Sequence, residues 1–393
     1  MSLDSRLNIY LKLSPAAKPK LQTKIQPPRL GYLRQTSYGE VWVVDWQYEI
    51  GQFHGRHEIA KTSGIPEIFD FKLKYFDPSI ATVIDTETTG TYAFIIGAGF
   101  WRDDKFIVRQ YLMRDFNEEP AQLAAFAEDF TGSAITYNGK CFDLPLLTSR
   151  YRLHRFEIPF ADCPHLDMLF PCRRIWKRSL SGFKLTQMEQ AVLGYARVDD
   201  IPSYLIPSIF FDYLQTRDET LLYPILNHNR DDILSLYHLT GIASTIINEN
   251  LEHGGNDDEL LLSLAEIYFN NADHSTAIAL IEKINFAFAS DFTKNRALLL
   301  KAIANKKLGQ WDDAIDGFNT LNNKARQIDL YIESAKIYEH KLKDPVKALE
   351  LVRKAEALNE FAAHLGAYNP SITDALSHRK KRLQFKITRL LHI

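Results

Sequence analysis

The stretch Val83-Ile-Asp-Thr-Glu-Thr-Thr-Gly90 decides how the rest of this sequence is interpreted. The stretch continues an apolar run that begins at Ile80, and it ends in a turn signal, Thr-Thr-Gly. It therefore predicts a buried strand followed by a turn. Side chains two residues apart in a strand point to the same side, which places the carboxylates of Asp85 and Glu87 together. Buried like charges are costly without a counter-ion, whereas Mg²⁺ or Mn²⁺ binds carboxylate oxygens. The stretch therefore indicates a divalent metal site, and an acidic strand end in contact with water is the alternative.

The sequence around this stretch changes from strand-like to helical patterns. Aromatic and β-branched residues predict strands at residues 41–51, 80–84, 92–101, 106–112 and 134–137. Apolar residues at helical spacing predict a helix over residues 119–130, and helices from about residue 185 onward, including one after Pro224. Strands followed and flanked by helices predict an α/β layer fold.

A second carboxylate motif is Tyr137-Asn-Gly-Lys-Cys-Phe-Asp143-Leu-Pro-Leu-Leu. The Asn-Gly pair favours a turn after the short strand, and a helix is predicted to begin at Asp143. An Asp in a first helical turn commonly caps free amide groups, which is the structural alternative to a role in a site. Asp167 is interpreted as a structural hydrogen-bonding partner, with a fifth acid at the site as its alternative.

The third motif is His228-Asn-Arg-Asp-Asp232, on the helix after Pro224. His228 and Asp232 are i and i+4 and therefore share one helix face. Asp231 is expected on a wetter face with Asn227 and Ser235, so Asp232 is the preferred candidate. A surface pair is the alternative explanation for the spacing of His228 and Asp232.

Together the three motifs resemble the DEDD exonuclease superfamily, which has the ribonuclease H-like fold. The run from about residue 80 to 239 resembles the YprB-type family, through Tyr137-Asn-Gly-Lys, His165-Leu-Asp-Met-Leu, Arg173-Arg-Ile-Trp, Ile201-Pro-Ser and the third motif. That family also carries a C-terminal tetratricopeptide region. The resemblance implies a mixed sheet flanked by helices, and a 3′–5′ exonuclease that hydrolyses phosphodiester bonds with two divalent metal ions, Mg²⁺ or Mn²⁺.

The resemblance also implies roles for individual residues. The metal ligands would be Asp85, Glu87, Asp143 and Asp232, and His228 would be the general base for the attacking water. One departure is that His228 precedes Asp232 by four residues, where the commonest histidine-type members have five. Two other functions stay open: a non-cleaving nucleic-acid-binding scaffold that uses helical repeats for protein interaction, and an endonuclease on the same fold.

A helical repeat follows residues 253–258, whose composition indicates a linker. Alanines recur in pairs 12 or 13 residues apart, with repeat steps of 37 and then 33 to 34 residues, at Ala265 and Ala277, Ala302 and Ala314, and Ala335 and Ala348. This spacing resembles tetratricopeptide repeats, whose period is about 34 residues. Generic helical hairpins without a ligand groove are the alternative. The expected domains are a basic N-terminal arm at 1–39, a ribonuclease H-like exonuclease domain at 40–250, tetratricopeptide-like repeats at 257–360 and a basic C-terminal tail at 361–393.

The 393 residues include 47 Lys and Arg and 49 Asp and Glu, and the net charge of -2 alone does not indicate a nucleic-acid partner. However, three acid-free windows at 5–39, 168–188 and 375–393 hold 7, 5 and 6 of the basic residues. The middle window also holds aromatic residues, which suits single strands because cations neutralise phosphates and rings stack on bases. A solvated helix face with a buried Trp is the alternative.

Two turn residues join this window as candidates, although Thr88 and Asn138 are expected mainly to shape the turns that hold the acids. The candidate nucleic-acid-binding residues are Thr88, Asn138, Arg173, Arg174, Trp176, Lys177, Arg178 and Lys184. The expected partner is a single strand or 3′ end of DNA or RNA, and the repeats are expected to contact a protein partner.

Other features argue against whole classes of protein. No run approaches the about 20 apolar residues of a membrane helix, and the N-terminus has no signal-peptide core, so no membrane contact is expected. The cysteines, Cys141, Cys163 and Cys172, form no disulfide framework, which favours a reducing compartment and a cytoplasmic location. Zinc at Cys163, His165 and Cys172 is disfavoured because their spacing is irregular.

Overall fold

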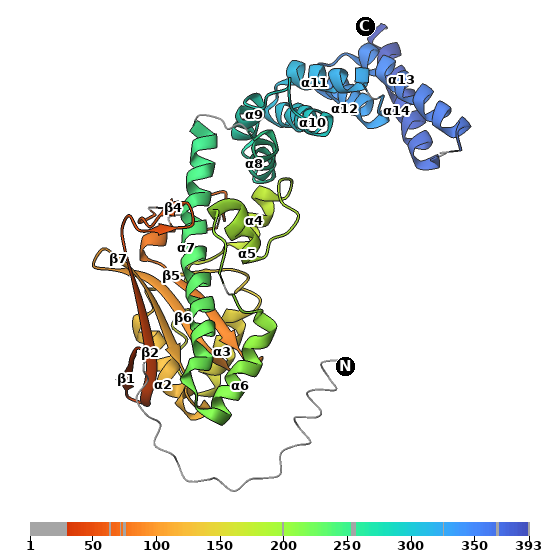
Figure 1. Ribbon diagram of the computed structural model, residues 1–393. Helices are drawn as coiled ribbons and strands as arrows, with labels where there is room; N and C mark the ends of the chain where they lie inside the picture. The colour runs from red at the N-terminus through yellow and green to blue at the C-terminus, as the bar shows by residue number, and fades with distance from the viewer. Residues whose placement is uncertain are drawn as a thin grey trace.

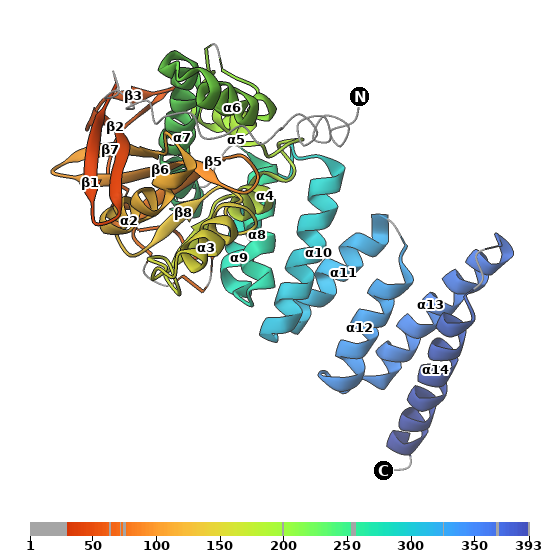
Figure 2. The ribbon, with the colours of Figure 1, turned by 90° about the horizontal axis from the view of Figure 1, so that it is seen from below.

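The computed structural model describes residues 30–62, 64–70, 72–73, 76–198, 200–252, 257–324, 326–366 and 369–391. Figure 1 shows a sheet with helices on both faces, from which a row of further helices extends. Figure 2, which views the molecule from below, shows these helices side by side in a row that leads away from the sheet. The chain thus has a sheet part followed by a helical part.

The sheet part holds nine strands among the described residues. Their bounds are β1 Tyr32–Thr36, β2 Gly39–Glu49, β3 Phe53–His54, β4 His57–Glu58, β5 Thr82–Thr88, β6 Ala93–Arg102, β7 Lys105–Leu112, β8 Ala134–Thr136 and β9 His165–Asp167. Seven of them form one sheet in the order β1-β2-β7-β6-β5-β8-β9, and β3 pairs with β4 apart from it. The β5–β8 and β8–β9 pairs are parallel and the other pairs are antiparallel, so the sheet is mixed.

Helices cover both faces of this sheet. Their bounds are α2 Glu119–Asp129, α3 Asp143–Leu153, α4 Leu169–Trp176, α5 Leu185–Met188, α6 Ile206–Thr216 and α7 Tyr223–Glu252. Short helical turns lie at Pro78–Ile80, Phe116–Glu118, Glu189–Leu193, Ser203–Leu205 and Glu219–Leu222. In β2, Val41 and Val43 pack with α2 and α3, whereas Trp42 and Val44 pack with α6 and α7. Burial of both faces explains why this strand is a continuous apolar run.

The helical part consists of consecutive helices that pack on one another. Their bounds are α8 Asp258–Asn270, α9 His274–Glu282, α10 Asp291–Leu308, α11 Trp311–Lys324, α12 Ile328–His340, α13 Pro345–His364 and α14 Pro370–Leu391. The six alanines of the predicted repeat are all buried, as expected for close helix contacts. A Cβ at Gly317 would lie 2.7 Å from the Cβ of Ala302, which shows how closely α10 and α11 approach. Membership of the tetratricopeptide class stays a prediction.

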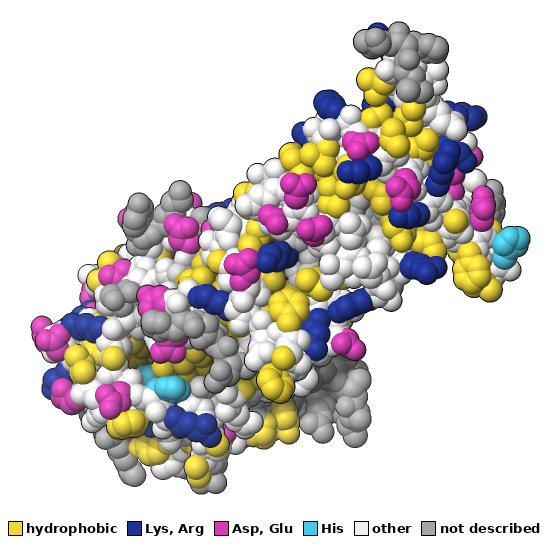
Figure 3. All heavy atoms as spheres, turned by 90° about the horizontal axis from the view of Figure 1, so that it is seen from above, with side chains coloured by type: hydrophobic (Ala, Val, Ile, Leu, Met, Phe, Trp, Pro, Cys, Tyr) yellow, Lys and Arg dark blue, Asp and Glu magenta, His cyan; other side chains and the backbone are white. Residues whose placement is uncertain are grey.

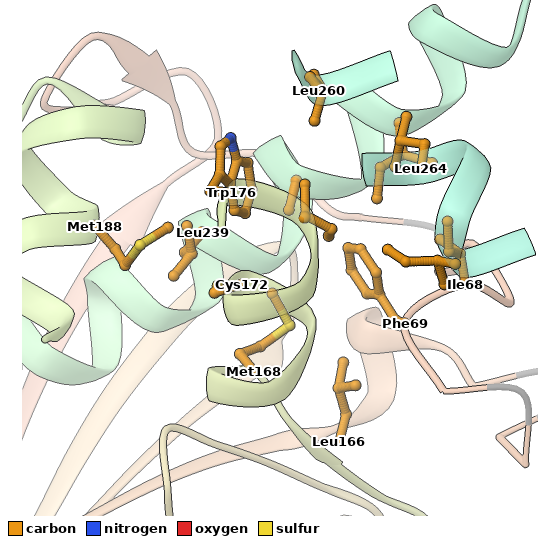
Figure 4. Packing of buried hydrophobic residues seen from close by; sticks show 14 of the residues in the cluster. Ile68, Phe69, Leu166, Met168, Cys172, Trp176, Met188, Leu239, Leu260 and Leu264 are labelled. Carbon is orange, nitrogen blue, oxygen red and sulfur yellow. The ribbon is translucent and has the colours of Figure 1, made fainter. Parts of the chain in front are cut away.

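One hydrophobic cluster joins the two parts. Figure 4 shows Cys172 and Trp176 of α4 among buried side chains that include Leu239 of α7 and Leu260 and Leu264 of α8. Burial of such side chains contributes about 1.5–3 kcal/mol each, so the helical part is attached by packing as well as by the chain. Across the described residues, no helix is long and apolar enough to cross a membrane.

The predicted α/β fold with a mixed sheet, followed by a helical region, agrees with the structure, whereas two domain limits do not. Within the predicted arm, Tyr32–Thr36 forms the edge strand β1 on β2, and residues 1–29 lie outside the described residues. The predicted tail at 361–393 contains the end of α13 and the helix α14, whose Leu376 and Leu383 are buried. Strand β9 was not predicted: of its three residues, His165 and Asp167 are polar, so the sequence shows no apolar run there.

Candidate active site

The carboxylates of β5 lie on the sheet face that α7 covers. Asp85 Oδ2 accepts a hydrogen bond from Asn229 Nδ2 at 2.7 Å, and Gln110 Nε2 donates to Asn229 Oδ1 at 2.9 Å. Gly97 pairs with Asp85 across the sheet, and a Cβ at Gly97 would lie 2.2 Å from Asn229 Oδ1. Glycine at this position therefore lets α7 approach closely enough for Asn229 to fix Asp85.

Asp143 reaches the site from α3, of which it is the first residue. Thr86 Oγ1 donates a hydrogen bond to Asp143 Oδ1 at 2.5 Å. The turn before α3 is held by Asp167, which accepts hydrogen bonds from the backbone nitrogens of Asn138 at 2.7 Å and Lys140 at 3.0 Å. Asn138 has a φ of +66°, a left-handed conformation that Asn tolerates better than most residues. Asp167 is thus a structural partner of the turn that presents Asp143, as the sequence interpretation favoured.

Helix α7 supplies the remaining members, His228 and Asp232, one turn apart. One potential ligand atom from each of Glu87, His228 and Asp232 lies within 4.8 Å of the other two. His228 Nε2 lies 3.5 Å from Asp232 Oδ2. The structure therefore brings Glu87 of β5 into one cluster with the α7 candidates, while Asp85 contacts α7 through Asn229.

The neighbouring residue Asp231 faces away from this cluster, but the predicted reason was wrong. Asp231 is buried and accepts a hydrogen bond from the Tyr195 hydroxyl at 3.0 Å. Ser235, expected on the same wetter face, is fully buried with its Oγ 2.7 Å from His54 Nε2. The loop and hairpin that cover this side of α7 are distant in sequence, so helical periodicity alone gave the wrong environment.

The electrostatics of the cluster show an excess of negative charge. Burial, followed by repulsion from Asp232, Glu87 and Asp143, raises the pKa of Asp85 well above its ordinary value. Burial also raises the pKa of Glu87 to about 8, although His228 opposes this change, and raises that of Asp143 to about 6, although the Thr86 hydrogen bond opposes it. Asp85 and Glu87 therefore each interact with the charges of both Asp143 and Asp232.

The pKa of His228 is shifted in the direction opposite to the one that burial alone would cause. Burial alone would lower the pKa of His228, but the carboxylates of Asp232, Glu87 and Asp200 outweigh burial and raise this pKa above its ordinary value. The imidazole is thus held beside several carboxylates, any of which stabilises its charged form.

Two residues of the loop between α5 and α6 also reach the site, and they were not predicted. Asp200 Oδ1 lies 2.6 Å from His228 Nδ1, which turns Nε2 toward Asp232. Arg197 forms an ion pair with Asp232 and donates to Glu189 Oε1 at 2.5 Å and Oε2 at 2.9 Å. The loop has no periodicity, and its contacts with α7 bridge about thirty residues of chain. The charged residues Arg197 and Asp200 themselves were the sequence signal that could have indicated a contact with the site.

The residues of the cluster fit a divalent cation. Four carboxylates offer the hard oxygen ligands that Mg²⁺ and Mn²⁺ prefer. The raised pKa values of Asp85, Glu87 and Asp143 express the cost of burying like charges together, which a bound cation would offset. Arg197 balances part of the charge through Asp232 and Glu189, and Asp85, Glu87 and Asp143 form no ion pair with Lys or Arg in the described chain within 4.0 Å.

The acid-free window 168–188 has a different role from the predicted one. Trp176 is buried in the cluster between α4 and α8, so its ring is not available for stacking on a base. Arg174 donates to the backbone carbonyl of Phe69, while Lys177 and Arg178 contact Glu266 of α8 at 2.6 and 2.8 Å. These contacts form an interface within the chain, which corrects the stacking role predicted for Trp176. Contact of Arg174, Lys177 and Arg178 with nucleic acid stays a prediction.

The other candidates of that prediction have less restricted surroundings. Arg173 and Lys184 are exposed. Thr88 Oγ1 accepts a hydrogen bond from the backbone nitrogen of Gly90 at 3.2 Å, so it shapes the turn after β5. Direct contact of Thr88, Asn138, Arg173 and Lys184 with nucleic acid stays a prediction.

Comparison with known proteins agrees with this geometry. Residues 82–244 match the family model of the RNase_H superfamily, and this range contains β5, α3 and the part of α7 that bears the cluster. The sheet part therefore holds a ribonuclease H-like domain, a class that suggests nuclease activity on nucleic acid and use of divalent metals. Over most of its length, this chain is also similar to the uncharacterized protein YprB of Bacillus subtilis (strain 168). It is 27% identical over 329 residues, which cover 79% of this chain and 78% of YprB.

Proposed function

We propose that this protein is a metal-dependent 3′–5′ exonuclease that acts on DNA or RNA through two divalent ions, Mg²⁺ or Mn²⁺. The observation that carries the proposal is the cluster of Glu87, His228 and Asp232, whose potential ligand atoms lie within 4.8 Å of one another. Asp85 lies near enough to interact with the charges of Asp232, Glu87 and Asp143. A binding scaffold has no physical need to place Asp85, Glu87 and Asp143 where burial and repulsion between carboxylates raise their pKa values. The same repulsion suits a site that holds cations.

Each residue of the candidate active site has a role in this proposal. Asp85, Glu87, Asp143 and Asp232 hold the ions, which when bound would activate water and neutralise charge on the phosphate. His228 accepts the proton of the attacking water at Nε2, because its Nδ1 is engaged by Asp200. Asn229 and Thr86 fix the orientation of Asp85 and Asp143.

The helical part belongs to the same proposal as tetratricopeptide-like repeats that recruit a protein partner or extend the path of the nucleic acid. Its buried alanine pairs support this view. A cytoplasmic location is proposed from the cysteine usage, and the three thiols are unpaired in the structure.

The polarity of cleavage tests the proposal against its alternatives. With Mn²⁺, a 5′-labelled single strand should shorten stepwise, while a 3′-labelled strand should release its label as the first mononucleotide. A circular single strand of the same sequence should stay intact. Cleavage of the circle would indicate an endonuclease, and tight binding of every strand without any product would indicate a scaffold.

A further inference from the structure

Two neighbouring grooves on the helical part are rich in basic side chains. The first, of about 270 Å³, lies between α10, α11, α12 and α14 and is lined by Lys306, Lys336, Lys341 and Arg379 around Trp311. The second, of about 400 Å³, lies at the ends of α12 and α14 and is lined by Lys343, Lys386 and Arg389. His340 lines both grooves, so they form one surface, here called the C-terminal cationic surface. In Figure 3, Lys and Arg side chains lie among hydrophobic and acidic ones over the far end of the helical part.

Positive charge on this surface exceeds what the neighbouring acids balance. Among the described residues that line the two grooves, seven are Lys or Arg and a single one, Glu339, is acidic. Glu333, beside the grooves, pairs with Lys306 and Lys336 and adds a second negative charge. The fully buried carboxylate of Glu339 accepts hydrogen bonds from Arg379 at 2.9 Å and from Arg382 and Lys386 at 2.7 Å. Three cations around one carboxylate repel one another, and one negative charge cannot neutralise them. The surplus charge favours a polyanionic ligand.

The fold holds these cations in place rather than leaving them on mobile side chains. Glu339 projects from α12 and fixes three cations of α14, while Glu333 of α12 accepts hydrogen bonds from Lys306 and Lys336. Lys341 Nζ lies 5.3 Å from the centre of the Trp311 ring. Cations fixed beside an aromatic ring match the chemistry of single strands, whose phosphates need counter-charge and whose bases stack.

We propose that the C-terminal cationic surface binds the phosphate backbone of a single-stranded nucleic acid. The choice of ligand rests on the proposed function, because that function supplies the nucleic acid. The surface is remote from the candidate active site: from Asp232 to the end of α7 is already about 30 Å, at 1.5 Å per residue. It therefore serves as a second site that retains a long strand while its 3′ end is processed, which raises the local concentration of that end.

A binding experiment on the full chain tests this proposal. The Asp85→Asn variant is used as background so that the strand survives, and a labelled single strand of about 40 nucleotides is titrated by fluorescence anisotropy over a series of salt concentrations. The test variant carries Lys341→Gln, Lys343→Gln and Arg389→Gln, three exposed residues that do not bond Glu339. The matched control carries Lys347→Gln, Lys354→Gln and Lys381→Gln, which remove the same charge from the helical part outside the grooves.

The expected result is a selective loss in the test variant. Removal of three phosphate contacts should lower the slope of log K against log salt by about 2, and weaken binding roughly 10-fold at low salt, with little change in the control. Equal losses in both variants, or no loss in either, would overturn the proposal. Loss of binding to poly-glutamate, with binding to the strand unchanged, would assign the surface to an acidic protein instead.

Failure of this inference and failure of the proposed function are distinguishable, because binding is measured without cleavage. If the wild-type protein shortens strands but the test variant binds them normally, the surface is not a strand-binding site. If the wild type cuts nothing and the test variant still loses affinity selectively, the exonuclease proposal fails and the surface remains a nucleic-acid site.

Discussion

The imidazole of His228 is held between two carboxylates that come from different elements. Its Nδ1 is 2.6 Å from Asp200 of the loop, and its Nε2 is 3.5 Å from Asp232 of the same helix. When one imidazole nitrogen is engaged by a carboxylate, the ring orientation and the tautomer are set for the other. In the proposed reaction, Asp200 is therefore a positioning residue that acts through His228.

Replacement of Asp200 by Asn should lower kcat about 10- to 100-fold, the usual cost of losing a group that orients a functional histidine. The KM for the strand and the melting temperature should change little, because Asp200 lies at the rim of the site with about a quarter of its side chain exposed. Single-turnover cleavage of a labelled strand with Mn²⁺ measures this effect.

The matched control is Asp212→Asn, which changes an exposed acid on the nearby helix α6. An equal fall in kcat for both variants would contradict the positioning role. A fall in the melting temperature of Asp200→Asn that accounts for the lost activity would assign Asp200 to stability instead.

Local sequence predicted the residues of the cluster where a periodic element fixes the direction of a side chain. Asp85 and Glu87 share a strand face, and His228 and Asp232 share a helix face, so period alone placed each pair together. Asp200 and Arg197 lie on a loop that has no period. Their contacts with His228 and Asp232 depend on how that loop folds over α7, which the sequence pattern does not specify.

At the scale of elements, helix α4 shows why a charge pattern can mislead. The basic residues in and just after this helix have no acidic neighbours in sequence, yet Lys177 and Arg178, which follow α4, contact Glu266, almost ninety residues later in the chain. Together with Arg296, they lower the pKa of Glu266 to about 2, although burial opposes this change. The partner of a helix face is decided by packing, so the sequence could not tell an internal interface from a free cationic surface.

The packing of α8 against α4 leads to a stability prediction. Leu264 is fully buried in the cluster that joins the two parts, so Leu264→Ala should lower the free energy of unfolding by about 2–5 kcal/mol. Leu308→Ala, at a half-exposed position of α10, should change it by no more than about 0.5 kcal/mol. Urea unfolding followed by circular dichroism compares the two variants. Similar midpoints for both would mean that α8 does not pack on α4 as described.

At the scale of the whole molecule, the small net charge conceals two kinds of basic segment. In the window 168–188, Lys177 and Arg178 contact α8, so they link it to the sheet part. Residues 375–391 of the C-terminal window lie in α14 and contribute to the C-terminal cationic surface. The first window lies nearest in sequence to the carboxylate motifs, yet the second offers more unbalanced charge. Proximity in sequence to the carboxylate motifs therefore did not indicate which basic segment carries the larger unbalanced charge.

The central claim is that Asp85, Glu87, Asp143 and Asp232 form a metal-dependent nuclease site. The most direct measurement compares cleavage of a 5′-labelled single strand by the wild type with Mn²⁺, by the wild type with EDTA, and by Asp85→Asn with Mn²⁺. The wild type with Mn²⁺ should produce a ladder of shorter strands. EDTA should abolish the ladder. The Asp85→Asn variant should form the ladder more slowly, by a larger factor than the about 10- to 100-fold that loss of an orienting group costs. The circular dichroism of this variant should match that of the wild type. Cleavage by Asp85→Asn at the wild-type rate, or no cleavage of DNA or RNA by the folded wild type, would contradict the claim.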